Sequence, residues 1–494
     1  MRRPAPELAT RFGDLDEAME YFDEERASGS HLLPVSSAAR IVNREALPAG
    51  RRQRVRPSAR YRRLRGNAAG RAGEFGDVCH FVRCHVCFGL RCLEGMSEHS
   101  NPSNPSKVVV IGGGYAGTLA ANRLRARLDV EITLVNPRAE FVERIRLHQF
   151  VARTGEATID YGTLLGEGIE LIVDSATRID TAARTVQLES GRGLDYDYLI
   201  YAVGSLTAIP MSVPGAGDFA FDVAELESAQ RLRARLEALP LDAAVTVVGG
   251  GLTAIETAAE LAEQGRRVTM MCGSTLAPTF STAGRRYIAR WLSRHGVDVL
   301  EAVSVSGVRQ DAVALASGEV RQSPLTIWAA GFGVPDLAAA SGLRTDRIGR
   351  LLTDETLTSI DDQRIMAAGD AAAPSGDPLR MSGYAAGPLG AQAADTVLSR
   401  IAGTEPGVID LAFSGACVSL GRHAGIRQLA RKDDTAVNLY IGGRMGAAIK
   451  ELTCKFVVAK RIRGEAREPG SMNWPKGGPR PAGAVSATEE VTSP

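Results

Sequence analysis

Two glycine-rich motifs carry the chemistry that is most directly visible in this chain. They are Gly112-x-Gly114-x-x-Gly117 and Gly249-x-Gly251-x-x-Ala254. Each follows an apolar run, at residues 108–111 and 245–248, and each opens an alanine-rich segment. In a strand, turn and helix of this kind, the first glycine permits the tight turn, the second lets backbone approach a pyrophosphate, and the third position packs helix on strand. The pair therefore predicts two bound dinucleotides, each facing the positive end of a helix.

An acidic residue normally follows the second strand of such a unit and binds the ribose hydroxyls of the nucleotide. The first unit has Asn136 there, whose amide can still bond to a hydroxyl. The second unit has Cys272-Gly273-Ser274 and no carboxylate, so nothing in this segment repels a 2'-phosphate. The sequence leaves the choice between NADH and NADPH open.

The elements that position these motifs alternate between strand and helix from residue 107 onward, which predicts an α/β fold. After the second unit the chain returns to an apolar strand that ends at Gly369 and Asp370. We therefore expect two Rossmann-like, three-layer domains, with the second inserted into the first. The predicted divisions are an extension and linker at 1–106, a first domain at 107–240 and 334–404, an inserted domain at 241–333, a small C-terminal domain at 405–465, and a disordered Pro/Gly/Ser-rich tail at 466–494.

The bulk composition excludes several other classes of function. The chain has 494 residues and a formal net charge of +1, without a concentration of basic residues in its ordered part, so nucleic acid is not an expected partner. No apolar run reaches the roughly 18 residues that span a bilayer, and the N-terminus lacks an apolar signal segment. We expect a cytoplasmic protein.

Residues 1–106 differ from the rest of the chain. An acidic stretch and an arginine-dense stretch precede a cysteine cluster, and Met96 opens a polar linker, so we interpret this part as a low-order extension with Met96 as an alternative start. The cluster contains Cys79-x4-Cys84-x2-Cys87 with His80 and His85 beside it. This spacing is that of a plant-type iron–sulfur site, and the histidines could bind zinc. Accidental crowding is the preferred interpretation because no strand or turn flanks the cluster, and we predict no metal site.

The motifs together resemble those of the two-dinucleotide-binding flavoproteins, the family of pyridine nucleotide-disulfide reductases and their relatives, over residues 107 to about 401. The resemblance implies FAD at the first motif and NADH or NADPH at the second. It also implies that Asp370, in Ala368-Gly369-Asp370, holds the ribityl chain of FAD, although a helix N-cap is an alternative role for this residue. The implied FAD contacts are Gly112, Gly114, Tyr115, Ala116, Gly117, Asn136, Arg144, Gly204, Gly369, Asp370, and Gly387 with Pro388 at the start of a helix. The implied NAD(P)H contacts are Gly249, Gly251, Thr253, Ala254 and Gly331.

Within that family the chain is similar to type II NADH:quinone oxidoreductases and apoptosis-inducing-factor-like flavoproteins, on residues 143–149, 249–256 and 391–394. The family's quinone motif reads Ala-Gln-x-Ala-x-Gln, which implies an acceptor site at Ala391 and Gln392. Here Thr396 replaces the last glutamine, which weakens the inference of quinone. The resemblance also implies that Glu256 is catalytic, close to nicotinamide and flavin. A carboxylate that only interacts with the helix dipole is the alternative.

The positions of the cysteines narrow the possible redox reactions further. Dithiol members of the family carry a cysteine pair in one of the two nucleotide units, whereas Cys272 is the only cysteine between Lys107 and Asp370. We therefore expect an FAD-dependent NAD(P)H oxidoreductase without a redox-active disulfide, which passes electrons from flavin to a quinone-like acceptor. The alternatives are a reductase of ferredoxin or rubredoxin, and a redox-sensing flavoprotein with little turnover.

The C-terminal domain ends in a basic segment of helical periodicity. Its apolar residues on one side are Ile449, Leu452, Phe456 and Val457, and its basic residues elsewhere are Lys450, Lys455, Lys460 and Arg461. An amphipathic basic helix can lie on an anionic membrane, which would place the protein peripherally on the inner face of the cell membrane. Packing of this helix onto the protein's own core or in a homodimer is the alternative.

Overall fold

The computed structural model describes residues 105–478 and residue 480. The predicted extension up to residue 104 lies outside these residues, and with it the cysteine cluster and Met96. Among the described residues, no helix combines the length and the apolar character needed to cross a bilayer.

A five-stranded parallel sheet forms the first unit, in the order β21, β9, β1, β2, β5. Its strands are β1 (Ser106–Ile111), β2 (Val130–Asn136), β5 (Ile169–Val173), β9 (Tyr198–Tyr201) and β21 (Ile365–Ala367). β9 and β21 are neighbours, with Leu199 beside Ile365, although the whole second unit lies between them in the sequence. The first sheet is therefore built from two separate parts of the chain.

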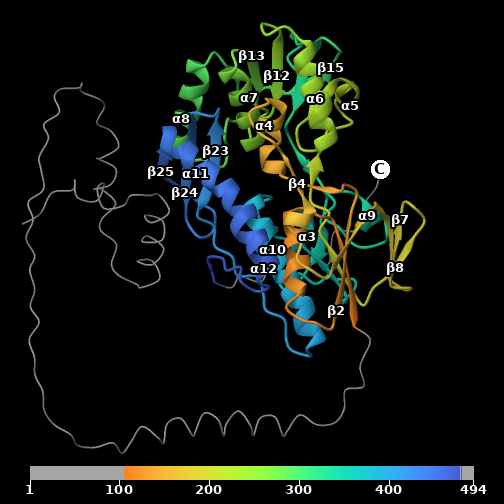
Figure 1. Ribbon diagram of the computed structural model, residues 1–494. Coiled ribbons are helices and arrows are strands. Elements are labelled where there is room, and N and C mark those ends of the chain that lie inside the picture. Colours follow the sequence, from red (N-terminus) through yellow and green to blue (C-terminus); the bar gives the residue numbers. More distant parts are fainter. Residues whose placement is uncertain (1–104, 479, 481–494) are drawn as a thin grey trace, which may run out of the picture. The chain divides into compact units, whose positions relative to one another are not determined.

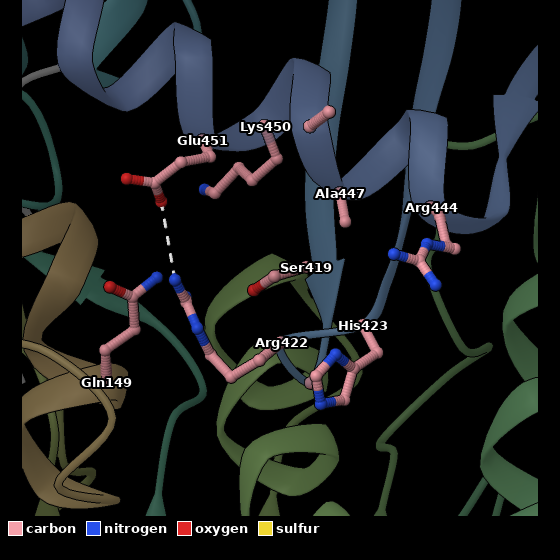
Figure 2. Close-up of a pocket in the computed structure, with 10 residues that line it drawn as sticks. Gln149, Ser419, Arg422, His423, Arg444, Ala447, Lys450 and Glu451 are labelled. Atoms are coloured by element: carbon pink, nitrogen blue, oxygen red, sulfur yellow. Dashed lines mark ion pairs between the residues drawn. The ribbon is translucent and has the colours of Figure 1, made fainter.

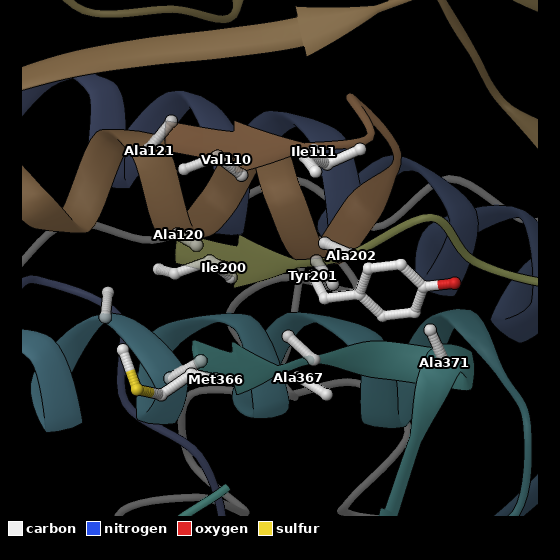
Figure 3. Close-up of a cluster of buried hydrophobic side chains, with 14 of the residues drawn as sticks. Val110, Ile111, Ala120, Ala121, Ile200, Tyr201, Ala202, Met366, Ala367 and Ala371 are labelled. Carbon is white, nitrogen blue, oxygen red and sulfur yellow. The ribbon is translucent and has the colours of Figure 1, made fainter. Parts of the chain in front are cut away.

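Two helices, α3 (Tyr115–Leu124) and α10 (Gly383–Ile401), pack against each other in the first unit. A Cβ atom on Gly390 would lie 2.2 Å from the carbonyl oxygen of Ala116, so the helix backbones approach too closely for a side chain at that point. The core beside them contains Val110, Ile200 and Met366 from three neighbouring strands (Figure 3). Burial of such side chains stabilises the unit by about 1.5–3 kcal/mol each.

A second five-stranded parallel sheet has the order β11, β18, β12, β13, β14. Its strands are β11 (Ala220–Asp222), β12 (Ala244–Val248), β13 (Arg267–Met271), β14 (Asp298–Leu300) and β18 (Leu325–Trp328), and its helices are α5 (Ala216–Phe219), α6 (Leu226–Ala238), α7 (Leu252–Glu263) and α8 (Thr282–Arg294). The predicted α/β fold with two Rossmann-like units is confirmed. The predicted boundary at residue 241 is wrong, because β11 pairs with β18 and α6 packs its leucines into the second core.

Shorter elements complete the two units. In the first they are β3 (Glu140–Val142), η2 (Arg144–Arg146), β4 (Thr158–Asp160), η3 (Tyr161–Thr163), β6 (Ala176–Asp180), β7 (Thr185–Leu188), β8 (Gly193–Asp195), α9 (Leu337–Ala340), β20 (Leu351–Thr353), η4 (Gly369–Ala371) and β22 (Ala372–Pro374). α4 (Leu147–Val151) follows η2 in the chain but packs against α6 and α7 of the second unit. In or beside the second they are β10 (Leu206–Thr207), β15 (Val305–Val308), β16 (Ala312–Leu315), β17 (Val320–Gln322) and β19 (Phe332–Gly333). β10 pairs with β19 where the chain enters and leaves the second unit.

The start of α10 differs from the prediction. The helix begins at Gly383, where the Ser382 hydroxyl accepts a hydrogen bond from the Ala385 amide, and Pro388 lies inside the helix. Proline has no N–H to donate to the carbonyl four residues earlier, which is that of Tyr384. The Arg461 guanidinium donates to this carbonyl instead, at 3.2 Å. The proline is tolerated because a side chain from another element replaces the missing donor.

The C-terminal segment joins the two units. It consists of the antiparallel strands β23 (Gly415–Leu420), β24 (Ala424–Ala430) and β25 (Ala436–Gly442), helix α11 (Gly443–Phe456), the π-helical segment η5 (Val457–Ile462) and α12 (Arg463–Arg467). Val418 and Ile426 belong to the second core, and Val458 and Ile462 to the first. Figure 1 shows this segment, in blue, running from α7 to α3 and α10.

Part of the predicted disordered tail is ordered. Met472 is buried in the first core, and its amide donates to the Glu465 carboxylate at 2.8 Å. The Trp474 indole donates to the Asp410 carbonyl at 2.9 Å. These apolar residues have a core to bind to, which the Pro/Gly-rich composition of the tail did not indicate.

Candidate active site

The first glycine motif has the geometry of a phosphate-binding loop. Gly112 has φ of +99°, and a Cβ there would lie 2.4 Å from the Ala202 carbonyl oxygen. A Cβ on Gly117 would lie 1.8 Å from the Gly112 oxygen, so both positions exclude side chains for steric reasons. Gly114 is different, because a Cβ there would meet no atom within 4 Å. It precedes α3 without a side-chain cap, so the helix N–H groups from Tyr115 and Ala116 onward face an open space that fits a pyrophosphate.

The second motif repeats this geometry. Gly249 has φ of +138°, and a Cβ there would lie 2.6 Å from the Ala329 oxygen and 3.1 Å from the Ala254 side chain. Gly251 precedes α7 without a side-chain cap and faces no atom within 4 Å of its Cβ position. Thr253 lies in the first turn, where its carbonyl accepts from Thr257. The residues of both motifs thus fit the two dinucleotides that the sequence predicts.

The two residues at the ribose positions have structural contacts. The Asn136 side chain accepts from the Gly113 amide at 2.9 Å and donates to the Arg138 carbonyl at 2.7 Å. Its amide therefore holds the glycine loop in place, and its bond to ribose stays a prediction. Cys272 points at the second loop, with its Sγ 3.6 Å from the Gly249 oxygen. Burial raises the pKa of this thiol to about 11, which keeps it neutral.

Three of the predicted flavin residues come together in the first unit. The Arg144 guanidinium donates to the Ser205 hydroxyl at 3.3 Å, and this hydroxyl donates to Asp370 at 2.8 Å. Gly204, at φ of +73°, places its Cβ position 3.6 Å from Arg144. Asp370 also accepts from the Ser382 amide at 3.2 Å, the residue that caps α10. Asp370 thus links the segment after β9, which contains Gly204 and Ser205, to the N-terminus of α10.

Three further predicted positions are glycines. Gly369 adjoins Asp370, and its Cβ position lies 2.9 Å from the Ala116 side chain. Gly369 and Gly331 both have positive φ, which glycine adopts without strain. The Cβ position of Gly387 faces Met472 and Arg461 and not an open space, because the C-terminal segment covers this part of α10.

The predicted acceptor residues are also covered. Ala391 is fully buried, and the Gln392 side chain donates to the Gly407 carbonyl at 2.8 Å. Thr396, which replaces the last glutamine of the motif, donates to the Thr356 carbonyl at 2.7 Å. All three residues pack inside the first unit in this structure, and the acceptor site at Ala391 and Gln392 stays a prediction.

Glu256 lies at the centre of a buried cluster of charged and polar groups. The Lys450 ammonium is 2.8 Å from its Oε1 atom, and the Ser419 amide donates to the same oxygen at 2.9 Å. His148 is 3.8 Å from Oε2, and its other ring nitrogen is 3.3 Å from the Ser419 hydroxyl. These residues come from α7, α11, β23 and α4. Leu147 and Val151 of α4 pack in the second core, so the cluster forms where the second unit meets the C-terminal segment.

The surroundings fix the charges of this cluster. Burial by itself would raise the pKa of Glu256, but the Lys450 ammonium, His148 and the hydrogen bond from the Ser419 amide together outweigh it, and the pKa lies below its usual value. Burial would likewise lower the pKa of Lys450, but the Glu256 carboxylate raises it well above the usual range. Burial lowers the pKa of His148 to about 4. At neutral pH the cluster therefore holds one carboxylate, one ammonium and a neutral imidazole.

The helix-dipole alternative for Glu256 is wrong. The first turn of α7 contains no acidic residue, and Glu256 lies beyond it. Lys450 was predicted to lie away from the packed face of α11, but only 12% of its side chain is exposed. Gly446, Lys450 and Cys454 follow one another at intervals of four, and both neighbours in this row are buried. In the sequence, this spacing indicates a buried stripe on the helix, and it could have identified Lys450 as a buried residue. No sequence signal points to Ser419.

A cavity of about 230 Å³ opens beside the cluster. It is lined by Gln149, Ser419, Gly421, Arg422, His423, Arg444, Ala447, Ala448, Lys450 and Glu451 (Figure 2). Arg422 and Glu451 form an ion pair across it at 3.5 Å, and Glu451 also binds Arg146 at 3.0 Å. Lys450 and Ser419 therefore belong both to the buried cluster and to the wall of this polar cavity.

When the pH falls from 6.5 to 4, we expect the free energy of unfolding to decrease less in the His148→Asn variant than in the wild type. The folded protein keeps His148 neutral down to a pKa of about 4, whereas the unfolded chain binds a proton at about 6.5. The unfolded state therefore binds more protons in this window, and the wild type loses up to about 1.4 kcal/mol per pH unit as the pH falls. Over the whole window, this loss in the wild type amounts to about 3 kcal/mol in the free energy of unfolding.

Urea unfolding at several pH values measures this difference. Glu260 acts with the opposite sign, because burial raises its pKa to about 7 and folding then binds a proton there. This contribution is common to both proteins and cancels in the difference between them. Parallel stability curves for variant and wild type from pH 7 to 4 would contradict the prediction.

The fold and the two nucleotide sites define a flavin- and pyridine-nucleotide-dependent oxidoreductase. Residues 106–394 match the pyridine nucleotide-disulphide oxidoreductase family. The chain belongs to this family, which confirms the resemblance seen in the sequence, and its cofactors are FAD and a nicotinamide dinucleotide.

Three relatives show how far the likeness extends. An NADH dehydrogenase-like protein of Mycobacterium tuberculosis is 33% identical over 306 residues, covering 56% of this chain and 75% of the relative. A type II NADH:quinone oxidoreductase of Staphylococcus haemolyticus is 26% identical over 372 residues, covering 67% of this chain and 91% of the relative. The structure of NDH2 from Plasmodium falciparum in complex with NADH is similar in fold, with a TM-score of 0.64 at 15% identity, covering 74% and 97%.

Proposed function

We propose that the chain is an FAD-dependent NADH dehydrogenase that passes electrons to a quinone-like acceptor. The observation that carries the proposal is the buried Glu256–Lys450 pair, 2.8 Å apart, where the nicotinamide unit meets the C-terminal segment. Relatives named as NADH dehydrogenase-like proteins and as type II NADH:quinone oxidoreductases support the same reaction. Bound FAD and NADH supply the redox chemistry, with hydride passing from nicotinamide to flavin.

The chain's own residues supply a positive charge beside the cavity. Reduction of a quinone to a quinol takes up two electrons from the flavin and two protons from solvent, and negative charge develops on the quinone oxygens on the way. Lys450 lines the cavity and stays charged at neutral pH because the Glu256 carboxylate raises its pKa. We assign Lys450 the role of stabilising this negative charge and Glu256 the role of holding Lys450 charged and in position.

The proposal includes no disulfide chemistry. Cys272 is the one cysteine between residues 107 and 370, and the structure records it as free and buried. Its raised pKa disfavours the thiolate that attacks a disulfide. Electrons would therefore leave the flavin directly for the acceptor.

Contact with a membrane would bring the protein to a lipid-soluble quinone. α11 exposes Met445 and Phe456, with 56% and 41% of their surface accessible, and Lys455 and Lys460 lie beside Phe456. The side of α11 that contains Gly446 packs on the protein itself, since a Cβ on Gly446 would lie 2.3 Å from the Gly425 oxygen. We propose that this exposed row touches anionic lipid without inserting a helix. Flotation with phosphatidylglycerol vesicles tests it, and equal flotation of a Met445→Ser/Phe456→Ser variant would rule it out.

Anaerobic stopped-flow mixing tests the main proposal. We expect the flavin absorbance near 450 nm to bleach with NADH and to recover rapidly when a soluble quinone is added. If the flavin absorbance instead recovers when an oxidised iron–sulfur protein is added and becomes reduced, but not when quinone is added, the protein is a ferredoxin-type reductase. A long-lived reduced state with either acceptor would indicate a redox sensor. Protein that purifies without flavin would overturn all three readings.

A further inference from the structure

The nicotinamide unit lacks the acidic residue that normally binds ribose, but its sheet places another carboxylate beside the vacant position. Cys272 follows β13 and occupies the position of the ribose acid. β13 pairs in parallel with β14, with Met271 beside Leu300, and the Cys272 amide donates to the Leu300 carbonyl at 2.8 Å. The pairing continues past both strands, because the Ala302 amide donates to the Ser274 carbonyl at 2.8 Å.

Glu301 lies between these two hydrogen bonds, directly across from the Cys272 segment. Its Oε1 atom accepts from the Leu276 amide at 2.5 Å, which ties the carboxylate to the loop that follows β13. The residue is otherwise exposed, so its second oxygen is free to meet a ligand. Burial and, second to it, the Glu301 carboxylate raise the pKa of Cys272, as expected for a negative charge near the thiol.

One positive group approaches the same loop. The Arg285 guanidinium of α8 lies 3.4 Å from the Thr275 hydroxyl. The Cβ position of Gly250 lies 2.9 Å from the Thr275 carbonyl oxygen and 3.1 Å from the Cys272 Sγ, so Arg285 approaches the loop on the same side of the glycine turn as Cys272. Glu301 contacts the loop at Leu276 and lies beside Cys272, where the ribose is expected.

We propose that Glu301 replaces the missing ribose acid from the neighbouring strand and makes the second nucleotide site select NADH over NADPH. This inference rests on the proposed function, since it names the substrate of the same site. A carboxylate accepts hydrogen bonds from both hydroxyls of a free ribose. It repels a 2'-phosphate, because two like charges near a protein surface oppose each other strongly at short distance.

Binding of two nucleotide fragments to the FAD-loaded protein tests the inference without turnover. Isothermal titration of ADP-ribose and 2'-phospho-ADP-ribose reports the ribose site alone, because neither fragment carries nicotinamide. We expect the wild type to prefer ADP-ribose by about tenfold or more. Glu301→Gln keeps an oxygen that can accept from Leu276, and we expect it to reduce the preference about tenfold, mainly by binding the phosphorylated fragment more tightly.

Two further variants serve as controls. Asp298→Asn removes an exposed carboxylate at the start of the same strand, and its preference should stay within about twofold of the wild type. Arg285→Gln tests the opposite assignment, in which the arginine recruits a 2'-phosphate, and should weaken both fragments similarly. An unchanged preference in Glu301→Gln, or a wild type that prefers 2'-phospho-ADP-ribose, would overturn the inference and leave the proposed dehydrogenase intact. A wild type that binds neither fragment would instead refute the nucleotide site on which the dehydrogenase rests.

Discussion

Replacing Lys450 with methionine should destabilise the holoprotein by about 3–5 kcal/mol, because it leaves the Glu256 carboxylate buried without its partner. Only 8% of the Glu256 side chain is exposed, and Lys450 is its nearest positive charge, at 2.8 Å. The Ser419 amide and hydroxyl remain, but neutral donors offset only part of the lost charge. Chemical unfolding at pH 8 measures the loss, with Lys432→Met, an exposed lysine of the same segment, expected within about 0.5 kcal/mol of the wild type.

The sign of the pH dependence separates this explanation from a general packing defect. Without Lys450, burial should raise the pKa of Glu256 above its ordinary value, so that the folded variant binds a proton which the unfolded chain does not. The variant should then gain stability relative to the wild type as the pH falls, and a Glu256→Gln/Lys450→Met double variant should recover much of the loss at every pH. A gap that stays constant with pH, with no recovery in the double variant, would contradict the ion-pair account.

The same variant tests the proposed role of Lys450 in turnover. We expect NADH to reduce the flavin at close to the wild-type rate, because Lys450 contacts neither glycine motif. Quinone reduction should slow by about 10²-fold or more, the usual contribution of a fixed group that stabilises developing negative charge. Equal slowing of both half-reactions would point to a distorted site and not to the loss of this charge stabilisation.

Valine at Gly114 should abolish FAD binding while the fold survives, and valine at Gly251 should abolish NADH binding while FAD stays. Both glycines have φ that any residue adopts, −74° and −82°, and neither Cβ position meets an atom within 4 Å. The cost to the fold is the weaker N-cap, about 1 kcal/mol in each case. A valine side chain would fill the space in front of the helix N-terminus, where the backbone must approach the pyrophosphate.

Flavin content after purification and NADH titration of the flavin absorbance give the two readouts. We expect Gly114→Val to retain less than about a tenth of the wild-type flavin, by steric exclusion at a phosphate loop. Gly251→Val should purify yellow and fail to bleach at NADH concentrations that reduce the wild type. The reverse pattern would exchange the two cofactor assignments, and loss of flavin in both variants would show that the two units do not fold independently of their ligands.

The amino-acid sequence alone determined the α/β fold, the two nucleotide units and the family. These follow from short-range requirements: Gly112 and Gly249 need positive φ beside a neighbouring carbonyl, and Gly114 and Gly251 leave helix N-termini open. Such requirements involve residues close in the chain, so spacing reveals them. The boundary before β11 and the start of α10 were less accessible, because a distant strand and the Arg461 side chain decide them.

Only the tertiary structure decided which charges act together. Glu256 meets Lys450 and Ser419 from segments more than 160 residues away, and Gln392 lies against the Gly407 carbonyl away from the cavity. In the same way Glu301 stands beside Cys272 because β14 pairs with β13. A spacing motif records neither the register between two strands nor the packing that buries a distant lysine against a carboxylate. The glycine motifs therefore identified the cofactors, and packing determined the site between them.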